Sequence, residues 1–302
     1  MLFTLLFYIF VFVLIIQSIY YIFIFGKFSF FQHKKTIQNT DPISVIICAR
    51  NESANLSANL KSILTQKHSD FEVIVVNDAS TDDSLKVLHS FKDQFQNLAI
   101  IDIASKSNYN GNKKLALAKG IAAASNERLL FTDADCMPAS PHWITGMTSQ
   151  FTKEKDIVLG YGGYKKIKGS LLNKLVRFET LLTAIQYFSY ANIGIPYMGV
   201  GRNLAYKKER FINANGFENH AHIKSGDDDL LINQIATKKN TSISIENDSF
   251  TISEPKKSFS EWFHQKRRHV TTANYYNYEH QLLLGLFYAS QFLFWFLAII
   301  LL

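Results

Sequence analysis

Two aspartates one residue apart, Asp133 and Asp135, follow the apolar run at 128–131 and are well suited to hold a metal ion. An apolar run of this length indicates a buried strand. Alternate side chains of a strand share a face, so both carboxylates can turn toward one ligand. Hard cations such as Mg²⁺ and Mn²⁺ take one or two carboxylates and keep open positions for phosphate oxygens. The pair therefore predicts a divalent cation site for chemistry on a phosphate ester, with a polar loop after a core strand as the alternative.

A second acidic cluster, Asp227, Asp228 and Asp229, lies in the second half of the chain. Crowded like charges raise the pKa of at least one member of such a cluster, and a carboxylate with a raised pKa is a better proton acceptor. We therefore expect a catalytic base here. A solvated acidic N-terminus of a helix is the competing interpretation.

The elements around these residues predict an α/β fold. Short apolar runs alternate with stretches of helical apolar spacing, which is typical of a mostly parallel central sheet with helices on both faces. We expect strands at 43–48, 71–76, 98–103 and 128–131, and helices at 52–66, after 80–83, at 112–124 and at 171–190. Ligands of such sheets bind beyond the carboxyl ends of the strands. The polar residues at these ends are Arg50, Asn51, Glu52, Asp78 and Asp133.

Apolar segments at both ends of the sequence predict attachment to a membrane. Residues 1–26 and 281–302 are long and apolar enough to cross a bilayer as transmembrane helices. The basic residues near them are Lys27, Lys34, Lys35, Lys266, Arg267 and Arg268. The positive-inside rule then places the region between the spans in the cytoplasm. We therefore expect a protein of the cell (inner) membrane whose catalytic domain faces the cytoplasm.

The domain boundaries follow from these segments. We expect the catalytic domain at 40–255 and an interfacial segment at 256–280, where aromatic and basic residues mix as in a helix at lipid head groups. A solvated loop is the alternative for that segment. The first span lacks the basic start and the cleavage site of a signal peptide. The sequence ends inside the last apolar stretch, which leaves open whether the natural chain continues past Leu302.

The composition and the absence of some common motifs limit the classes of ligand and partner that we expect. The chain has 302 residues, 47% of them hydrophobic, and a net charge of +7. The basic residues gather near the apolar ends and the motif-rich loops, so anionic lipids and an anionic donor account for the charge without nucleic acid. No Gly-X-Gly-X-X-Gly or Gly-Lys-Ser/Thr motif supports a dinucleotide fold or a Walker loop. The lone cysteines, Cys48 and Cys136, form neither a disulfide framework nor a zinc site and fit a reducing cytoplasm.

Taken together, these motifs resemble the family 2 glycosyltransferases, in particular the membrane-attached branch with cellulose, chitin and hyaluronan synthases and single-addition relatives. The resemblance covers about residues 42–270. The matching segments are 43–52, 75–82, 111–120, 128–136, 199–206, 225–230 and 265–269. It implies a glycosyltransferase A-type fold, a nucleotide-sugar donor with a lean to UDP, and a divalent cation, Mn²⁺ or Mg²⁺.

The resemblance also implies roles for the matching residues. The donor-binding residues are Arg50, Glu52, Asp78, Lys113, Asp133, Gln265 and Arg268, with Asp78 reading the uracil and Lys113 facing phosphate. Asp133 and Asp135 bind the metal, and Asp228 is the catalytic base beside Asp227. The acceptor-side residues are Gly199, Gly201, Arg202 and His269. His269 stands where the family's Gln-X-X-Arg-Trp motif has Trp, which weakens the expectation of a processive synthase.

We therefore expect inverting transfer of a sugar to an acceptor hydroxyl of a lipid-linked or growing glycan at the cytoplasmic membrane face, with membrane lipids as further partners. A sugar-nucleotide nucleotidyltransferase is one alternative, but it would show a Gly-rich basic loop where this chain has Arg50-Asn51-Glu52. A non-catalytic membrane scaffold on the same fold is another. It predicts no metal-dependent binding of a nucleotide sugar.

Overall fold

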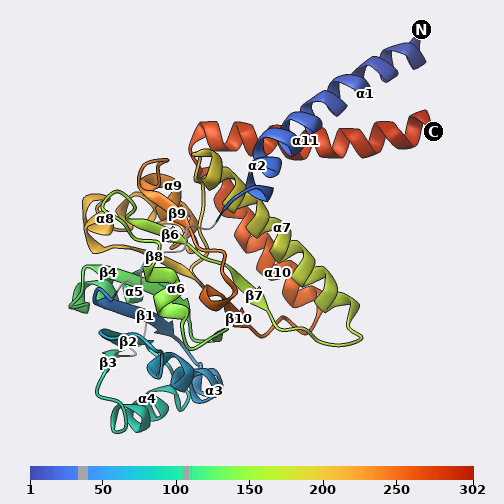
Figure 1. Ribbon diagram of the computed structural model, residues 1–302. Coiled ribbons are helices and arrows are strands. Elements are labelled where there is room, and N and C mark those ends of the chain that lie inside the picture. The colour runs from blue at the N-terminus through green and yellow to red at the C-terminus, as the bar shows by residue number, and fades with distance from the viewer. Residues whose placement is uncertain (33–39, 105–108, 110) are drawn as a thin grey trace.

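The computed structural model describes residues 1–32, 40–104, 109 and 111–302, and a mixed sheet forms its centre (Figure 1). The strands of this sheet are β1 (Ile43–Ala49), β2 (Phe71–Asp78), β3 (Leu98–Ile103), β4 (Arg128–Asp133), β6 (Ile157–Leu159), β8 (Leu204–Lys207) and β9 (Thr241–Ile243). Within the described residues their order is β3-β2-β1-β4-β8-β6-β9. The four strands expected from the sequence are confirmed, and β1, β2 and β4 run one or two residues further than expected. Asp78 and Asp133 are therefore the last residues of their strands rather than loop residues.

The first four strands are parallel and end at one edge of the sheet. β1 lies between β2 and β4, and Cys48 of β1 is opposite Asp133 of β4. β3 pairs with β2, so that Ile103 is opposite Asp78. The sheet then reverses, because β8 is antiparallel to both β4 and β6. The mostly parallel sheet is confirmed, and the carboxyl ends of β1, β2 and β4 meet where a ligand crevice is expected.

Helices pack on both faces of this sheet. Ile46 of β1 belongs to the apolar cluster on the face of α5 (Lys113–Ala123), whereas Val45 and Ile47 face the cluster of α3 (Ser53–Leu64) and α4 (Ser84–Lys92). This alternation is the period of two that a strand buried on both faces requires. A Cβ at Gly120 would come within 2.8 Å of Ile46, so a glycine here lets α5 approach the sheet closely.

A smaller sheet and several helices complete the region around the strand ends. β5 (Cys136–Pro138), β10 (Thr251–Ser253) and β7 (Gly162–Tyr164) form the small sheet. Apart from the helices at the two ends of the chain, the other helical segments are α6 (Trp143–Thr148), α7 (Leu171–Ile193), α8 (Lys208–Asn213), η2 (Glu218–His220), α9 (Asp229–Ile235), η3 (Asn247–Ser249), α10 (Phe259–Val270) and η4 (Thr271–Tyr275). The helix expected at 171–190 is confirmed as α7. The helical structure of α10 and η4 rules out the loop alternative for most of the segment 256–280.

Two apolar helices project from the body of the molecule at the ends of the chain (Figure 1). α1 (Leu2–Ile19) continues through η1 (Tyr20–Phe25) into α2 (Gly26–Ser29), and α11 (Tyr278–Leu301) is the second. Both are long and apolar enough to cross a membrane by length and composition. Polar contacts join them: Gln17 donates to Ser290 Oγ at 2.5 Å, and the Tyr20 hydroxyl donates to the Leu283 carbonyl at 2.7 Å. Lys34 and Lys35, on which the expected orientation partly depends, lie outside the described residues.

Candidate active site

A small acidic pocket opens at the carboxyl ends of β1 and β4. Its lining includes Lys113, Asp133, Gly201, Asp227 and Asp228, and its free volume of about 10 Å³ corresponds to about one water molecule. These residues come from four separate segments of the sequence. The structure therefore brings the two acidic clusters identified in the sequence into one site.

Lys113 joins the two acidic clusters directly. As the first residue of α5, it places its Nζ 3.0 Å from Asp133 Oδ1 and 3.0 Å from Asp227 Oδ2. Burial disfavours the ammonium form, but the carboxylates of Asp133, Asp227 and Asp228 raise the pKa of Lys113 well above its usual value. Burial likewise acts against the Asp227 carboxylate, yet Lys113 lowers the pKa of Asp227. The pocket thus holds one cation among three carboxylates.

Asp228 is the carboxylate with the greatest tendency to take up a proton in this pocket. Its Oδ2 accepts from the Gly201 N–H at 2.6 Å, and its Oδ1 accepts from the Asp229 N–H at 2.8 Å. Desolvation, followed by the charges of Asp227 and Asp229, raises the pKa of Asp228 to about 7. A Cβ at Gly201 would stand 3.2 Å from Asp228 Oδ2, so a glycine at this position allows the close contact. Such a carboxylate is poised to accept a proton near neutral pH.

Asp229, the third member of the cluster, is turned away from the pocket and held by the C-terminal segment. Its Oδ2 accepts from Thr272 Oγ1 at 2.5 Å and from the Tyr276 hydroxyl at 2.8 Å. Burial raises the pKa of Asp229, while these hydrogen bonds oppose the shift. Asp229 therefore fixes the start of α9, and with it Asp228, to the segment that leads into α11.

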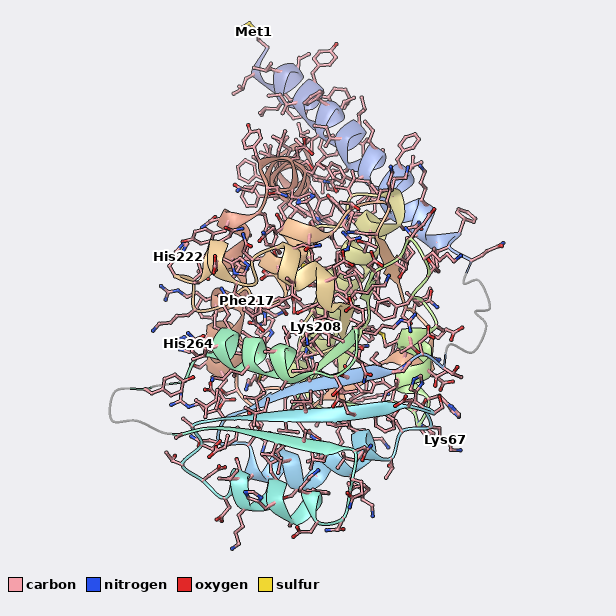
Figure 2. The ribbon with its side chains drawn as sticks, turned by 90° about the vertical axis from the view of Figure 1, so that its left-hand side faces the viewer. Met1, Lys67, Lys208, Phe217, His222 and His264 are labelled. Carbon is pink, nitrogen blue, oxygen red and sulfur yellow. The ribbon has the colours of Figure 1, made fainter. Side chains whose placement is uncertain are left out.

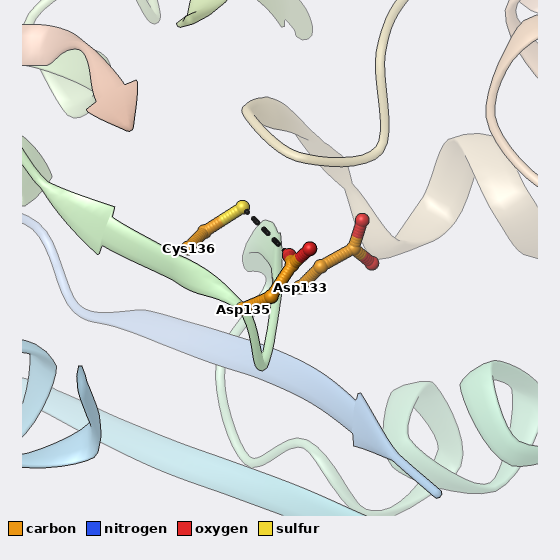
Figure 3. Close-up of side chains that lie close together, drawn as sticks. All are labelled: Asp133, Asp135 and Cys136. Atoms are coloured by element: carbon orange, nitrogen blue, oxygen red, sulfur yellow. Dashed lines mark hydrogen bonds between the residues drawn. The ribbon is translucent and has the colours of Figure 1, made fainter. Parts of the chain in front are cut away.

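Asp133, Asp135 and Cys136 form a compact group of potential metal ligands (Figure 3). Their ligand atoms lie within 4.8 Å of one another. The sequence predicts that strand alternation brings the two carboxylates together, and this prediction is wrong. β4 ends at Asp133, and Asp135 lies in the turn to β5. The turn after β4, and not an extended strand, therefore brings Asp135 close to Asp133.

The electrostatics of this group fit a hard divalent cation. Desolvation and then the neighbouring Asp133 raise the pKa of Asp135, a crowding that a bound cation relieves. Burial and the two carboxylates raise the pKa of Cys136 to about 12, so it is a neutral thiol that donates to Asp135 Oδ1 at 3.5 Å. Oxygen ligands without thiolate are the set preferred by Mg²⁺ and Mn²⁺. Arg202 also faces this pair, and both carboxylates are among the groups that raise its pKa against the effect of burial.

The expected donor-side residues at the other strand ends lie near the pocket, with partners that the sequence did not reveal. Both oxygens of Asp78 accept hydrogen bonds, from the Tyr109 hydroxyl at 2.6 Å and from the Asn112 N–H at 2.9 Å. Arg50 packs over Gly111, where a Cβ would come within 2.0 Å of its guanidinium. Burial first, and then the charges of Asp135 and Asp133, raise the pKa of Glu52.

Tyr164 connects an expected acceptor-side residue with an expected donor-side residue. The guanidinium of Arg202, expected on the acceptor side, lies 4.4 Å above the Tyr164 ring. Gln265 of α10, expected on the donor side, donates to the Tyr164 hydroxyl at 3.2 Å. Gly199, in contrast, is buried, and a Cβ there would meet Leu204, Leu159 and Ile232. Its surroundings are those of a packing residue. Arg268, expected on the donor side, and His269, expected on the acceptor side, are both exposed near the end of α10.

Lys114 is a buried lysine near the site whose role could not be predicted from the sequence. Only 5% of its surface is exposed, and its Nζ donates to the His220 carbonyl at 2.6 Å and to the Ile223 carbonyl at 2.9 Å. It thereby holds the segment that leads into the three aspartates. Two adjacent lysines at a helix start give no sign of which one is buried, so the sequence carries no signal for this contact.

Comparison with known proteins identifies the family. The sequence model described as glycosyl transferase family 2 matches residues 44–209. The chain belongs to the family 2 glycosyltransferases. Poly-β-1,6-N-acetyl-D-glucosamine synthase of Staphylococcus epidermidis is 34% identical over 170 residues, which are 55% of this chain and 39% of that protein. Poly(ribitol-phosphate) β-glucosyltransferase of Bacillus spizizenii is 31% identical over 132 residues, 42% of this chain and 19% of that protein. The chain thus matches less than half the length of these curated relatives.

Solved structures share the fold of this glycosyltransferase. The mannosyltransferase PcManGT from Pyrobaculum calidifontis, in complex with GDP-Man and Mn²⁺, matches 99% of this chain and 85% of its own with a TM-score of 0.68 and 17% identity. Residues 1–349 of S. aureus TarS, in complex with UDP-GlcNAc, match with a TM-score of 0.53 and 15% identity over 82% of this chain and 70% of that one. At these identities the likeness concerns the fold, which is the glycosyltransferase A-type fold expected from the sequence.

Proposed function

We propose that this chain transfers a sugar, with inversion, from a nucleotide-sugar donor to an acceptor hydroxyl. The observation that carries the proposal is the shared pocket: Asp228, with its pKa of about 7, lines the same small cavity as Asp133. Direct displacement at the anomeric carbon needs a proton acceptor on one side of the sugar and a stabilised leaving group on the other. Asp228 can serve as the proton acceptor, and Asp133 lies where a leaving group would be stabilised, within the same site.

The geometry supports one proposed role for each of these residues. Asp228 accepts the proton of the attacking hydroxyl, and the N–H groups of Gly201 and Asp229 hold its two oxygens in place. Asp133 and Asp135 would hold a divalent cation, which as a Lewis acid neutralises charge on a leaving nucleoside diphosphate. Lys113, which pairs with Asp133 and Asp227, adds a positive charge on the donor side.

The donor and acceptor are proposed by analogy with the relatives. One fold neighbour is described with UDP-GlcNAc and another with GDP-Man, and we favour a UDP-linked sugar. If Asp78 binds the uracil, the imide N–H of that base must donate to the Asp78 carboxylate. It must then share the carboxylate with the Tyr109 hydroxyl or displace that hydroxyl. The relatives named above make or modify glycan and glycopolymer chains, so the acceptor is a lipid-linked or growing glycan.

The surface next to the terminal helices supports membrane lipids as partners. α7 exposes Leu171, Leu175, Phe178 and Leu182 at helical spacing. α10, which is joined to α7 by the ion pair between Lys266 and Glu179, exposes Phe259 and Phe263. These faces suit an interfacial position between two spans, α1–α2 and α11, with the catalytic domain in the cytoplasm.

A donor screen tests the proposed function. We expect the full chain in detergent, with Mn²⁺, to release a nucleoside diphosphate from one member of a panel of nucleotide sugars. Asp228→Asn should abolish transfer while nucleotide binding persists, and the exposed Asp248→Asn is the matched control. Wild-type turnover in Asp228→Asn refutes the assignment of the base. Pyrophosphate release from a nucleoside triphosphate would instead favour the nucleotidyltransferase alternative.

A further inference from the structure

A second and larger cavity lies beside α9 and has a lining separate from that of the acidic pocket. It has a volume of about 280 Å³ and lies between the segment 219–223, α9 and the junction of η4 with α11. This is just below the range of about 300–1,000 Å³ that is typical of pockets for drug-sized ligands. The cavity therefore has room for one small polar unit such as a sugar ring.

The lining of this cavity is polar but uncharged. Its polar members are Asn219, His220, Asn233, Gln234, Tyr275 and Asn277, and two aliphatic side chains complete it. Among the described residues, the lining contains no Lys, Arg, Asp or Glu. Desolvation and then the charge of Lys114 lower the pKa of His220 to about 4, so that its ring is neutral as well.

Two features of the lining point to a ligand. His220 is only 6% exposed, and its Nε2 has no hydrogen-bond partner among the described residues, although a buried ring nitrogen normally has one. Tyr275 is 55% exposed, and its ring rests edge-on against the ring of His222, at 6.0 Å between centroids. Figure 2 shows His222 on the side of the molecule between the terminal helices and the central sheet. An exposed aromatic face beside amide groups can pack against a sugar ring while the amides bond its hydroxyls.

The chemistry of the lining excludes other ligand classes. A phosphate or a nucleotide calls for cationic side chains, and the lining has none among the described residues. Asn233, Gln234 and Asn277 already donate to backbone carbonyls. An apolar ligand would still remove the exposed amide of Asn219 from water without a partner, which is unfavourable. We propose that this cavity is a second carbohydrate-binding site, which holds one sugar unit of a neutral glycan away from the catalytic pocket.

The cavity and the catalytic pocket share their supporting elements. Leu230 lines the cavity two residues after Asp228, and it packs so closely on Gly226 that a Cβ there would come within 2.4 Å. His220 contacts Lys114, the neighbour of Lys113 in α5. The inference rests on the proposed function, since a glycan bound here identifies the acceptor as a glycan chain rather than a bare lipid head group.

Direct binding tests the proposal. The full chain is placed in an amine-oxide detergent, which carries no sugar, without nucleotide or metal, and is titrated calorimetrically with cellotetraose and chitotetraose. Glycerol 3-phosphate serves as the anionic comparison. We expect one tetrasaccharide to bind and glycerol 3-phosphate not to bind. Tyr275→Ala and Asn219→Ala, both at exposed positions, should weaken tetrasaccharide binding by about tenfold or more, whereas the exposed Tyr278→Ala should not.

The outcomes separate this site from the catalytic proposal. Failure of both tetrasaccharides to bind, or unchanged binding in Tyr275→Ala and Asn219→Ala, overturns the second site. Preferential binding of glycerol 3-phosphate overturns its neutral character. Asp228→Asn should still bind the tetrasaccharide, because Asp228 lies outside the lining of this cavity. Absence of nucleoside diphosphate release from every donor overturns the proposed function instead.

Discussion

The substitution Asp228→Asn removes the charge of the proposed base with little change in its shape. Desolvation, Asp227 and Asp229 raise the pKa of Asp228 from 3.8 to about 7. A group with a raised pKa in the folded state binds a proton more tightly there than in the unfolded chain. Its contribution to stability is therefore complete below about pH 4 and is lost as the pH rises to about 7. Asparagine does not titrate and has no such dependence.

The size of this effect follows from the pKa. Each pKa unit corresponds to about 1.36 kcal/mol, and wild type loses stability over the two units between pH 5 and the pKa of about 7. Between pH 5 and pH 8 the unfolding free energy of the variant should therefore rise relative to wild type by about 3 kcal/mol. This is an upper value, because Asp228 is only partly buried and solvent screens its charge. The variant also loses one of two N–H hydrogen bonds, a penalty that does not depend on pH.

Urea unfolding of the full chain in detergent, at pH 5 and at pH 8, measures this difference. Trp143 is fully buried and donates to Asn203 Oδ1 at 3.0 Å, so tryptophan fluorescence reports on the core of the catalytic domain. The exposed Asp248→Asn should show no relative change between the two pH values. If the stability difference between Asp228→Asn and wild type stays within about 0.5 kcal/mol across this range, the raised pKa is refuted.

Three further outcomes follow from the site. Transfer by wild type should rise about tenfold per pH unit below pH 7 and level off above it, because only ionised Asp228 accepts a proton, and a flat profile would contradict this role. Asp135→Asn should raise the Mn²⁺ concentration for half-maximal activity by about tenfold or more, and an unchanged Mn²⁺ titration would count against the cation site. Gly226→Ala should lower the unfolding free energy by about 1–3 kcal/mol, because Gly226 has φ +86° and a Cβ would meet Leu230. An unchanged urea midpoint would rule out that strain.

The fold could be predicted where the apolar residues of the sequence follow a clear pattern. The strands at 43–48, 71–76, 98–103 and 128–131 are apolar runs with helical stretches between them, and the structure has all four. β6 and β9, with three residues each, are too short for a period to show. The antiparallel direction of β8 depends on how distant segments pair, which no local pattern records.

The candidate site could be predicted as a set of residue types but not as a set of contacts. The two acidic clusters do meet, and Lys113 lies between them. The partners that position these groups are far away in the sequence and of common types. Tyr109 on Asp78 and Tyr276 on Asp229 are examples. A single tyrosine in an aromatic-rich sequence gives no indication that its hydroxyl bonds to a buried carboxylate.

The hydrogen bonds from Thr272 and Tyr276 to Asp229 have a practical consequence for protein engineering. Cutting the chain at residue 255 would remove the apolar C-terminal helix and improve solubility, but it would also leave the Asp229 carboxylate without both side-chain donors. A buried charge stripped of its donors is strongly unfavourable. Soluble versions should therefore retain the polypeptide at least through Tyr276, or replace Asp229 with a neutral residue at the same time.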